Sequence, residues 1–413
     1  MLVLTGWLNG GGAERVVVQL LNGPGLAGAR VELGLLRREG AYINDVDPAL
    51  IHTRSWGERL FPSDGTNASF YLPHRIAMSA LTGPLVFRQI IGEVRPDVIM
   101  SVGRGPNLLV YLALKTMGAG RPAWIVRDGN NLGRMTSDEA RGRTRRRLGL
   151  ALTRKAYRTA DCLLVNSEAL ARNMAEVLEI ERRSVRVIRN PIDIGSIRRS
   201  ASETAATGFE GPFIFTAGRL VHQKGHDVLI RAFASSAFRG SHRLVIAGEG
   251  PELEALRALA GESGVGDRVI FPGFQKNPWT WMRRADLYVL PSRWEGCPNA
   301  LAEALACGAP AVASDCQFGP SELITHERDG WLVQPEDTGA LADAMDRLLA
   351  NGELRARLGV AAARTMEQFD RKRIIPEYGA LFAEAARTRQ MPVMDEAEDY
   401  AFAERAVSLG PAE

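Results

Sequence analysis

Lysine is scarce in this sequence of 413 residues: only five of the 51 basic residues are lysines, and the others are arginines. A lysine in a ligand-like setting therefore stands out. The 48 acidic residues leave a formal net charge of only +3. So balanced a composition excludes a protein whose whole surface binds nucleic acid, and any basic function must be local.

Secretion and membrane-spanning signals are missing as well. The four cysteines (Cys162, Cys297, Cys307 and Cys316) have neither metal-ligand spacing nor a disulfide framework, which favours a reducing cytoplasm. The start of the chain lacks the basic and apolar regions of a secretory signal. No stretch approaches the ~18 apolar residues of a membrane span. A soluble or peripheral protein is expected.

The apolar pattern predicts the fold class. Short apolar runs alternate with longer amphipathic ones, as in β-α-β units that build a parallel sheet. We therefore expect an α/β protein with two facing Rossmann-like, doubly wound domains and a cleft between them. The expected strands lie at residues 2–4, 31–36, 98–101, 124–126 and 162–166 in the first half, and at 213–217, 243–247, 268–271, 287–290 and 311–313 in the second.

Changes in composition set the expected domain limits. Residues 1–190 are expected to form an N-terminal Rossmann-like domain, and residues 191–211, which include a Ser/Ala/Thr/Gly-rich stretch, are expected to form a linker. Residues 212–368 are expected to form a second, C-terminal Rossmann-like domain. A helix at 369–390 is expected to return to the N-terminal domain. The tail 391–413, with six acidic residues and one arginine, is predicted to be solvated.

Glycine-rich turns follow several of the expected strands. The first, at residues 9–17, has three glycines before a helix, so backbone amides and a helix N-terminus can approach an anion; a plain tight turn is an equal alternative. In the second half, Gly218-Arg219 and Lys224-Gly225 follow a strand. A fork-shaped arginine and the rare lysine can hold one pyrophosphate from two sides, and a solvated loop is the alternative. Turns at 248–251 and 272–274 either flank a base or are simple turns.

The most specific pattern is Glu295 and Glu303 around the start of a helix, in the stretch Pro-Ser-Arg-Trp-Glu-Gly-Cys-Pro-Asn-Ala-Leu-Ala-Glu. The helix N-terminus offers unpaired N–H groups to a phosphate, and the two carboxylates accept hydrogen bonds from sugar hydroxyls. The pattern therefore indicates a nucleoside diphosphate that carries a sugar. The alternative is a favourable charge at a helix start beside a surface glutamate.

These motifs resemble the family-four retaining glycosyltransferases, which have the GT-B fold. The resemblance rests on Gly-Gly-Ala-Glu-Arg-Val at 11–16, the Arg219 and Lys224 loop, Gly-Glu-Gly-Pro at 248–251 and Glu-x7-Glu at 295–303, in the family's order. It implies that a sugar is transferred from a nucleotide-sugar, with retention of configuration and without a metal or cofactor. The stretch 314–322 resembles relatives that build surface polysaccharides and lipid-linked oligosaccharides, which favours a UDP-linked hexose or N-acetylhexosamine.

The resemblance also implies roles for single residues. Arg219 and Lys224 hold the diphosphate, Glu295 holds the donor sugar, and Glu303 holds the ribose. The remaining donor-binding positions that it implies are Gly12, Gly218, Gly250, Gly273, Phe274, Gly296, Asn299, Ala300 and Leu301.

One position departs from the family's pattern. Many relatives have a histidine where this chain has Arg127, which offers charge to the leaving group or sugar but cannot act as a base. The alternatives for Arg127 are that it caps a strand or pairs with Asp128. Asp45 and Asp47 match a metal-binding Asp-x-Asp superficially, but no nucleotide motif surrounds them, and a surface turn is expected.

A basic helix is the local cationic patch. Residues 141–158 contain eight basic residues and no acid, and Arg143, Arg147, Arg154 and Arg158 recur at helical spacing opposite an apolar face. Such helices lie on anionic membranes, so a peripheral enzyme on the inner membrane face with a glycan or lipid-linked acceptor is expected. A solvated helix face is the alternative. Nucleic acid is disfavoured because no aromatic side chains are interleaved. A same-fold enzyme with a small soluble acceptor and a non-catalytic sugar-binding or membrane-binding protein stay open.

Overall fold

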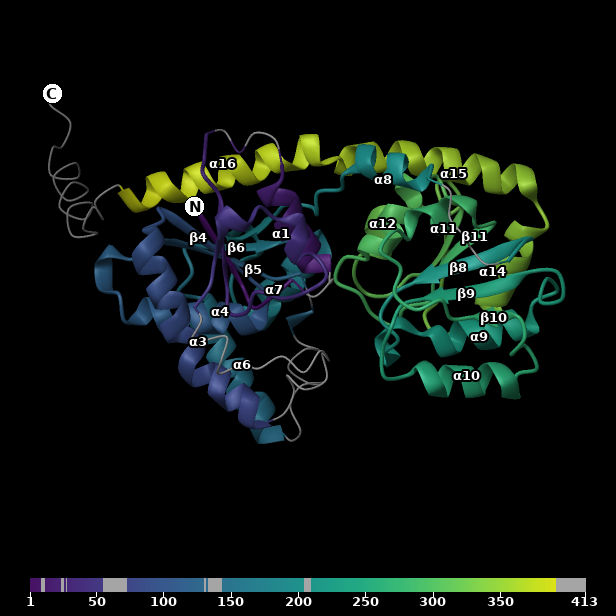
Figure 1. The fold of residues 1–413 in the computed structure, drawn as a ribbon, viewed down its shortest axis with the longest axis horizontal. Coiled ribbons are helices and arrows are strands. Elements are labelled where there is room, and N and C mark those ends of the chain that lie inside the picture. The colour runs from purple at the N-terminus through teal and green to yellow at the C-terminus, as the bar shows by residue number, and fades with distance from the viewer. Residues whose placement is uncertain are drawn as a thin grey trace, which may run out of the picture.

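A computed structural model describes residues 1–8, 12–23, 26, 28–54, 73–129, 131–132, 143–203 and 209–390. It contains two separate parallel sheets, one in each half of the chain (Figure 1). The tail 391–413, part of the first glycine loop and residues 204–208 of the expected linker lie outside the described residues.

The N-terminal sheet has the strand order β3-β2-β1-β4-β5-β6-β7, and the order departs from sequence order at β1 and β4. Its strands are β1 (Leu2–Thr5), β2 (Glu32–Leu35), β3 (Ile51–His52), β4 (Val98–Val102), β5 (Ala123–Arg127), β6 (Cys162–Val165) and β7 (Val185–Val187). Every described pair is parallel. The helices that cover it are α1 (Gly12–Leu21), α3 (Pro73–Val94), α4 (Arg104–Lys115), α6 (Arg143–Tyr157) and α7 (Glu168–Leu178).

The C-terminal sheet repeats this plan with the order β10-β9-β8-β11-β12-β13. Its strands are β8 (Phe213–Ala217), β9 (Arg243–Ala247), β10 (Val269–Ile270), β11 (Leu287–Leu290), β12 (Ala311–Ser314) and β13 (Trp331–Val333). Its helices are α9 (His226–Ser235), α10 (Leu253–Glu262), α11 (Trp279–Arg284), α12 (Asn299–Ala306), α13 (Pro320–Leu323), α14 (Thr338–Leu349) and α15 (Gly352–Met366). The predicted α/β fold of two doubly wound domains is confirmed.

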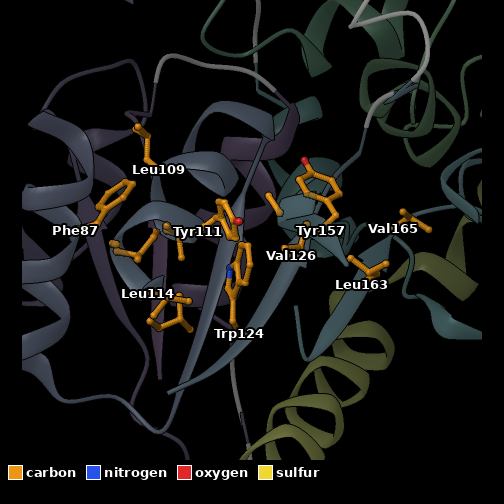
Figure 2. Packing of buried hydrophobic residues seen from close by; sticks show 14 of the residues in the cluster. Phe87, Leu109, Tyr111, Leu114, Trp124, Val126, Tyr157, Leu163 and Val165 are labelled. Carbon is orange, nitrogen blue, oxygen red and sulfur yellow. The ribbon is translucent and has the colours of Figure 1, made fainter. Parts of the chain in front are cut away.

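Burial on both faces explains why these strands are continuous apolar runs. Leu2 and Leu4 of β1 pack into one core cluster, whereas Val3 packs into another on the opposite face of the sheet. Figure 2 shows the first of these clusters, in which Trp124 of β5 lies close to Tyr111 of α4. The indole of Trp124 also donates to Ser101, 2.8 Å away, so the one polar atom of this large side chain is satisfied.

The last helix joins the two halves. After α15 in the C-terminal domain, α16 (Arg371–Gln390) runs across the top of the molecule to the N-terminal domain (Figure 1). There Ile375, Tyr378 and Phe382 are buried in the same cluster as Val3. The chain therefore crosses between the domains twice, once before β8 and once through α16.

The segment 191–211 is not simply a linker, and this interpretation is corrected. Helix α8 (Ile194–Ala201) lies within it and packs against α11 and α12. Ile194, Ile197 and Ala201 are buried in the C-terminal core, and Phe209 packs against Phe213. The linker prediction rested on the small residues at 200–211. The apolar residues that bury this helix lie mostly before that stretch, so its composition gave no sign of them. Within the described residues, none of the helices is both long and apolar enough to cross a membrane.

Candidate donor site at the domain boundary

Helices α1 and α12 lie on the two sides of the domain boundary (Figure 1), and a hydrogen bond joins their N-termini. Asn299, the first residue of α12, donates through Nδ2 to the carbonyl oxygen of Gly12, the first residue of α1, over 3.0 Å. The side chain of Asn190 donates to Oδ1 of Asn299 over 2.8 Å. Two helix N-termini, each with a positive dipole end, therefore converge. Gly12 and Asn299, both predicted to bind the donor, are brought together.

Lys224 and Glu295 also meet, although 71 residues separate them. The ammonium nitrogen of Lys224 lies 2.6 Å from Oε1 of Glu295, and the hydroxyl of Ser292 donates to the same oxygen over 2.6 Å. Glu295 is buried, with 5% of its surface exposed. The contact exists because the loops that carry these residues follow β8 and β11, which are adjacent strands of the sheet. The carboxyl ends of adjacent parallel strands lie at one edge.

Arg293 binds these two loops to each other. Its guanidinium donates to both carboxylate oxygens of Asp227 over 2.8 and 2.7 Å, and to the carbonyl of His222 over 2.8 Å. Its backbone N–H donates to Gln223, 2.9 Å away. Burial opposes the charge of Asp227, but the hydrogen bonds from Arg293 outweigh it and lower the pKa of Asp227. Arg293 therefore fixes the position of the Lys224 loop relative to the Glu295 loop.

Glu303, in α12, is held by both domains. Oε2 accepts a hydrogen bond from the indole nitrogen of Trp279 over 2.9 Å, and Oε1 forms an ion pair with Arg15 of α1. Burial opposes the charge of Arg15, but Glu303 and Tyr42 outweigh it and raise the pKa of Arg15. Glu303 is buried, with 4% of its surface exposed.

The other predicted donor residues lie along the same edge of the C-terminal sheet. The turns at Gly218, Gly248 and Gly273 follow β8, β9 and β10, and successive backbone hydrogen bonds join them. Gly248 and Gly250 are needed because a Cβ at either would collide with the backbone of the neighbouring turn. Their immediate role is close packing of backbone rather than contact with a ligand.

The remaining residues predicted to bind the donor differ in how far they are exposed to solvent. Arg219 is exposed, and Phe274 is half exposed. Gly296 is buried. Leu301 is buried in the C-terminal core and Ala300 is partly buried against it, and their predicted contact with the donor stays a prediction.

Arg127 has a different environment from the one the sequence suggested. Only 2% of it is exposed, and its guanidinium donates to Oδ1 of Asn190 over 2.6 Å and to the hydroxyl of Tyr378 in α16 over 3.3 Å. Asp128 accepts instead from Tyr157. The alternative pairing of Arg127 with Asp128 is therefore not what the structure shows. Arg127 thus links β5 to the two segments that run between the domains, through Asn190 in the first and Tyr378 in the second. Its catalytic role stays a prediction.

The four arginines of the basic helix divide into two kinds. Arg154 and Arg158 donate to the carbonyls of Val177 and Leu178 over 2.7 and 2.8 Å, and both pair with Glu179. They therefore cap the last turn of α7, a structural role that the spacing did not predict. Arg147 is exposed. Arg143 begins α6.

The apolar face of this helix is also divided. Ala156 is fully buried, but 71% of Leu148 and 40% of Leu152 are exposed. The Asp-x-Asp sequence is a surface turn, as expected: Asp45 ends a short 3₁₀ turn, and Asp47 accepts from the N–H of Ala49 over 2.9 Å.

Sequence reasoning missed Arg15, Tyr42, Trp279, Asp227 and Arg293. Arg15 lies inside the recognised Gly-Gly-Ala-Glu-Arg-Val motif, and Arg293 lies two residues before Glu295, so proximity to a motif was the available signal. Tyr42 and Trp279 had no such signal because they reach the site through the packing of separate elements.

Two facing domains, each a doubly wound parallel sheet, define the GT-B class of glycosyltransferase folds. The family model described as Glycosyltransferase Family 4 matches residues 10–196, and the one described as Glycosyl transferases group 1 matches residues 202–365. The chain belongs to this family of glycosyltransferases. The resemblance carried by the motifs is confirmed.

The most similar proteins include two bacterial enzymes. The N-acetylgalactosamine-N,N'-diacetylbacillosaminyl-diphospho-undecaprenol 4-alpha-N-acetylgalactosaminyltransferase of Campylobacter jejuni is 30% identical over 218 residues, which span 53% of this chain and 59% of that protein. The lipopolysaccharide core biosynthesis glycosyltransferase LpsD of Rhizobium meliloti is 29% identical over 90% of this chain and 95% of its own length. The structure of Anabaena HepE in complex with UDP and glucose superimposes with a TM-score of 0.71 over 92% of this chain and 98% of HepE. At 20% identity this likeness shows the fold alone.

Proposed function

We propose that the chain is a retaining, metal-independent glycosyltransferase. It moves a hexose or N-acetylhexosamine from a UDP-sugar to a lipid-linked or polysaccharide acceptor in cell-envelope glycan biosynthesis. The observation that carries the proposal is the meeting of Lys224 and Glu295 beside the paired N-termini of α1 and α12. A cation, a carboxylate and two helix N-termini with positive dipole ends match a diphosphate joined to a sugar.

The chain's own cations account for the chemistry. Lys224, the exposed Arg219 and the helix amides would stabilise the negative charge that develops on the departing diphosphate, so no metal ion is required for that task. Glu295 would hold hydroxyls of the sugar, and Glu303 those of the ribose. Attack from the same face as the leaving group, with the leaving phosphate taking the acceptor's proton, gives retention. The reaction needs no cofactor, because the nucleotide-sugar is itself a substrate.

Similar proteins support the choice of donor and acceptor. The HepE structure holds UDP and glucose, and the Campylobacter enzyme is named for an acceptor carried on diphospho-undecaprenol. LpsD is named for lipopolysaccharide core biosynthesis. The proposed place of action is the cytoplasmic face of the inner membrane, where a lipid-linked acceptor would lie.

A donor screen tests the proposal. The full chain is incubated with UDP-, GDP- and ADP-linked hexoses and N-acetylhexosamines, with and without EDTA, and released nucleotide is measured. Release with a UDP-sugar, unchanged by EDTA, is the expected result. When a product forms, its anomeric proton coupling in NMR reports the configuration, and an inverted product contradicts retention. Turnover of none of the donors supports the alternative of a non-catalytic binding protein.

A mixed basic and apolar surface supports the membrane part of the proposal. Six large hydrophobic residues of the described chain are exposed, and four of them lie on α3, α4 and α6: Leu85, Leu112, Leu148 and Leu152. Helix α4 packs against both α3 and α6. Arg147 and Lys155 of α6 are exposed beside these leucines. Apolar side chains among basic ones are what an anionic membrane surface binds.

Liposome sedimentation tests this surface. The double variant Leu148→Ser, Leu152→Ser is expected to lose binding to vesicles that contain anionic phospholipid and to retain activity on a soluble acceptor analogue. Val360→Ser is the matched control, because Val360 is equally exposed, at 57%, but lies on α15 in the other domain. Failure of the wild-type chain to bind at moderate salt favours the alternative of a small soluble acceptor.

A further inference from the structure

Glu303 has no carboxylate oxygen free of the protein. Trp279 donates to Oε2 over 2.9 Å, and Arg15 pairs with Oε1. Glu303 is buried, so little of it is in contact with solvent. Each carboxylate oxygen can accept a second hydrogen bond, but only 4% of Glu303 is exposed, so a ribose reaches this carboxylate only when one of these two partners moves. Trp279 belongs to the same domain as Glu303 and packs against its core, whereas Arg15 comes from the opposite domain.

Arg15 is held in its place by a second set of contacts. Its Nε and Nη2 atoms donate to the hydroxyl of Tyr42 over 2.9 and 2.6 Å. Its guanidinium carbon lies 5.2 Å from the ring centre of Tyr42 and 5.6 Å from that of Trp279. Arginine presents five donors in a flat fork, and here the fork is hydrogen-bonded to Tyr42 and lies near two aromatic rings. The contact of Arg15 with Glu303 is therefore a specific interaction between the two domains.

We propose that Arg15 gates the ribose subsite. Arg15 pairs with Glu303 when no donor is bound, and the ribose hydroxyls of the donor displace it from Glu303. The inference rests on the proposed function, because it takes Glu303 as the ribose-binding residue. Arg15 then belongs to a two-state element, paired with Glu303 before binding and released after it. Donor binding and the contact between α1 and α12 become coupled, and such coupling is reciprocal.

The gate predicts a gain of affinity on mutation. Arg15→Met keeps an unbranched apolar stem and removes the competitor, so the Kd for UDP should fall by about fivefold or more, the lower range of couplings between sites. Inorganic pyrophosphate, which has no ribose, should bind the variant and the wild type equally. Both affinities are measured by isothermal titration calorimetry. Weaker or unchanged binding of UDP by Arg15→Met overturns the gate, because Arg15 would then support the ribose or be neutral.

Two further variants keep the test decisive. Tyr42→Phe removes only the hydroxyl that holds the guanidinium of Arg15. It should also tighten UDP binding, but by less than Arg15→Met does. Arg186→Met is the matched control, because Arg186 pairs with Glu384 on the surface, away from the boundary, and it should change neither affinity. If Arg186→Met tightens UDP binding as much as Arg15→Met does, the gate is overturned.

Glu303→Gln separates this inference from the proposed function. If the gate is correct, the double variant Arg15→Met, Glu303→Gln binds UDP no more tightly than Glu303→Gln alone. If wild-type UDP affinity is retained in Glu303→Gln, the ribose assignment fails, and the gate fails with it. If Glu303→Gln weakens UDP binding but Arg15→Met does not strengthen it, the ribose assignment stands and only the gate is lost.

Discussion

The ammonium group of Lys224 lies 2.6 Å from Oε1 of Glu295, so the cation expected to bind the diphosphate and the carboxylate expected to bind the sugar are paired with each other. Arg15 and Glu303 repeat this arrangement across the domain boundary. Both carboxylates of the Glu-x7-Glu motif are thus paired with a cation of the chain. The phosphate and hydroxyl groups of the proposed donor would compete for these contacts, because they offer the matching charges and hydrogen-bond donors.

Lys224→Met should lower kcat/KM for transfer by about 10²- to 10³-fold, the range measured when one charge-stabilising group is removed from an active site. The stem of Lys224 lies along Gly218, and methionine preserves that packing. Lys372→Met is the control, because Lys372 is an exposed lysine of α16. Near-normal turnover by Lys224→Met contradicts the donor-site assignment.

Asp227→Asn should lower kcat/KM by about 10- to 100-fold although Asp227 is not expected to contact the substrate. Small displacements of reacting groups slow a reaction strongly. It removes one of the two oxygens that Arg293 grips, and Arg293 sets the distance between the Lys224 and Glu295 loops. The loss should fall mainly on kcat, and Arg293→Lys should share it.

Asp343→Asn is the control for this pair, because Asp343 is exposed on α14. Equal kinetics in Asp227→Asn and Asp343→Asn would show that Arg293 does not position the site.

The contrast between predicted and missed features has a physical cause. The central strands were predicted because burial on both faces leaves continuous apolar runs. The edge strands β3, β7 and β13, which have only two or three residues each, were not predicted. Lys224 and Glu295 carried local motifs, but their contact depends on β8 lying beside β11. Arg15 reaches Glu303 through the packing of one domain on the other, and no local pattern encodes that.

His226 should make the stability of the C-terminal domain depend on pH. Burial and the nearby charge of Lys224 lower the pKa of His226 to about 4, from 6.5 in an unfolded chain. Between these values the unfolded state binds more protons than the folded one, so stability rises with pH from about 4 to 6.5 and is level above it. The linkage corresponds to roughly 3 kcal/mol at this site, at 1.36 kcal/mol for each pKa unit.

Urea unfolding at a series of pH values measures this effect. In His226→Leu the rise between pH 4 and 6.5 should be smaller than in the wild type, because leucine does not titrate. His326→Leu is the control, since His326 is not buried. Parallel curves for the wild type and His226→Leu would contradict a buried neutral imidazole.

Arg158 and Arg147 should separate stability from membrane binding on one helix. Arg158→Ala removes hydrogen bonds to the carbonyl of Leu178 at the end of α7, which should lower the free energy of unfolding by about 1 kcal/mol. Arg147→Ala should leave stability unchanged and weaken binding to anionic vesicles by about fivefold, the effect of one basic residue near such a surface. Thermal unfolding and vesicle sedimentation are measured on both variants. If Arg147→Ala binds vesicles like the wild type while Arg158→Ala does not, the membrane contact lies beside α7 rather than on the exposed leucine face of α6.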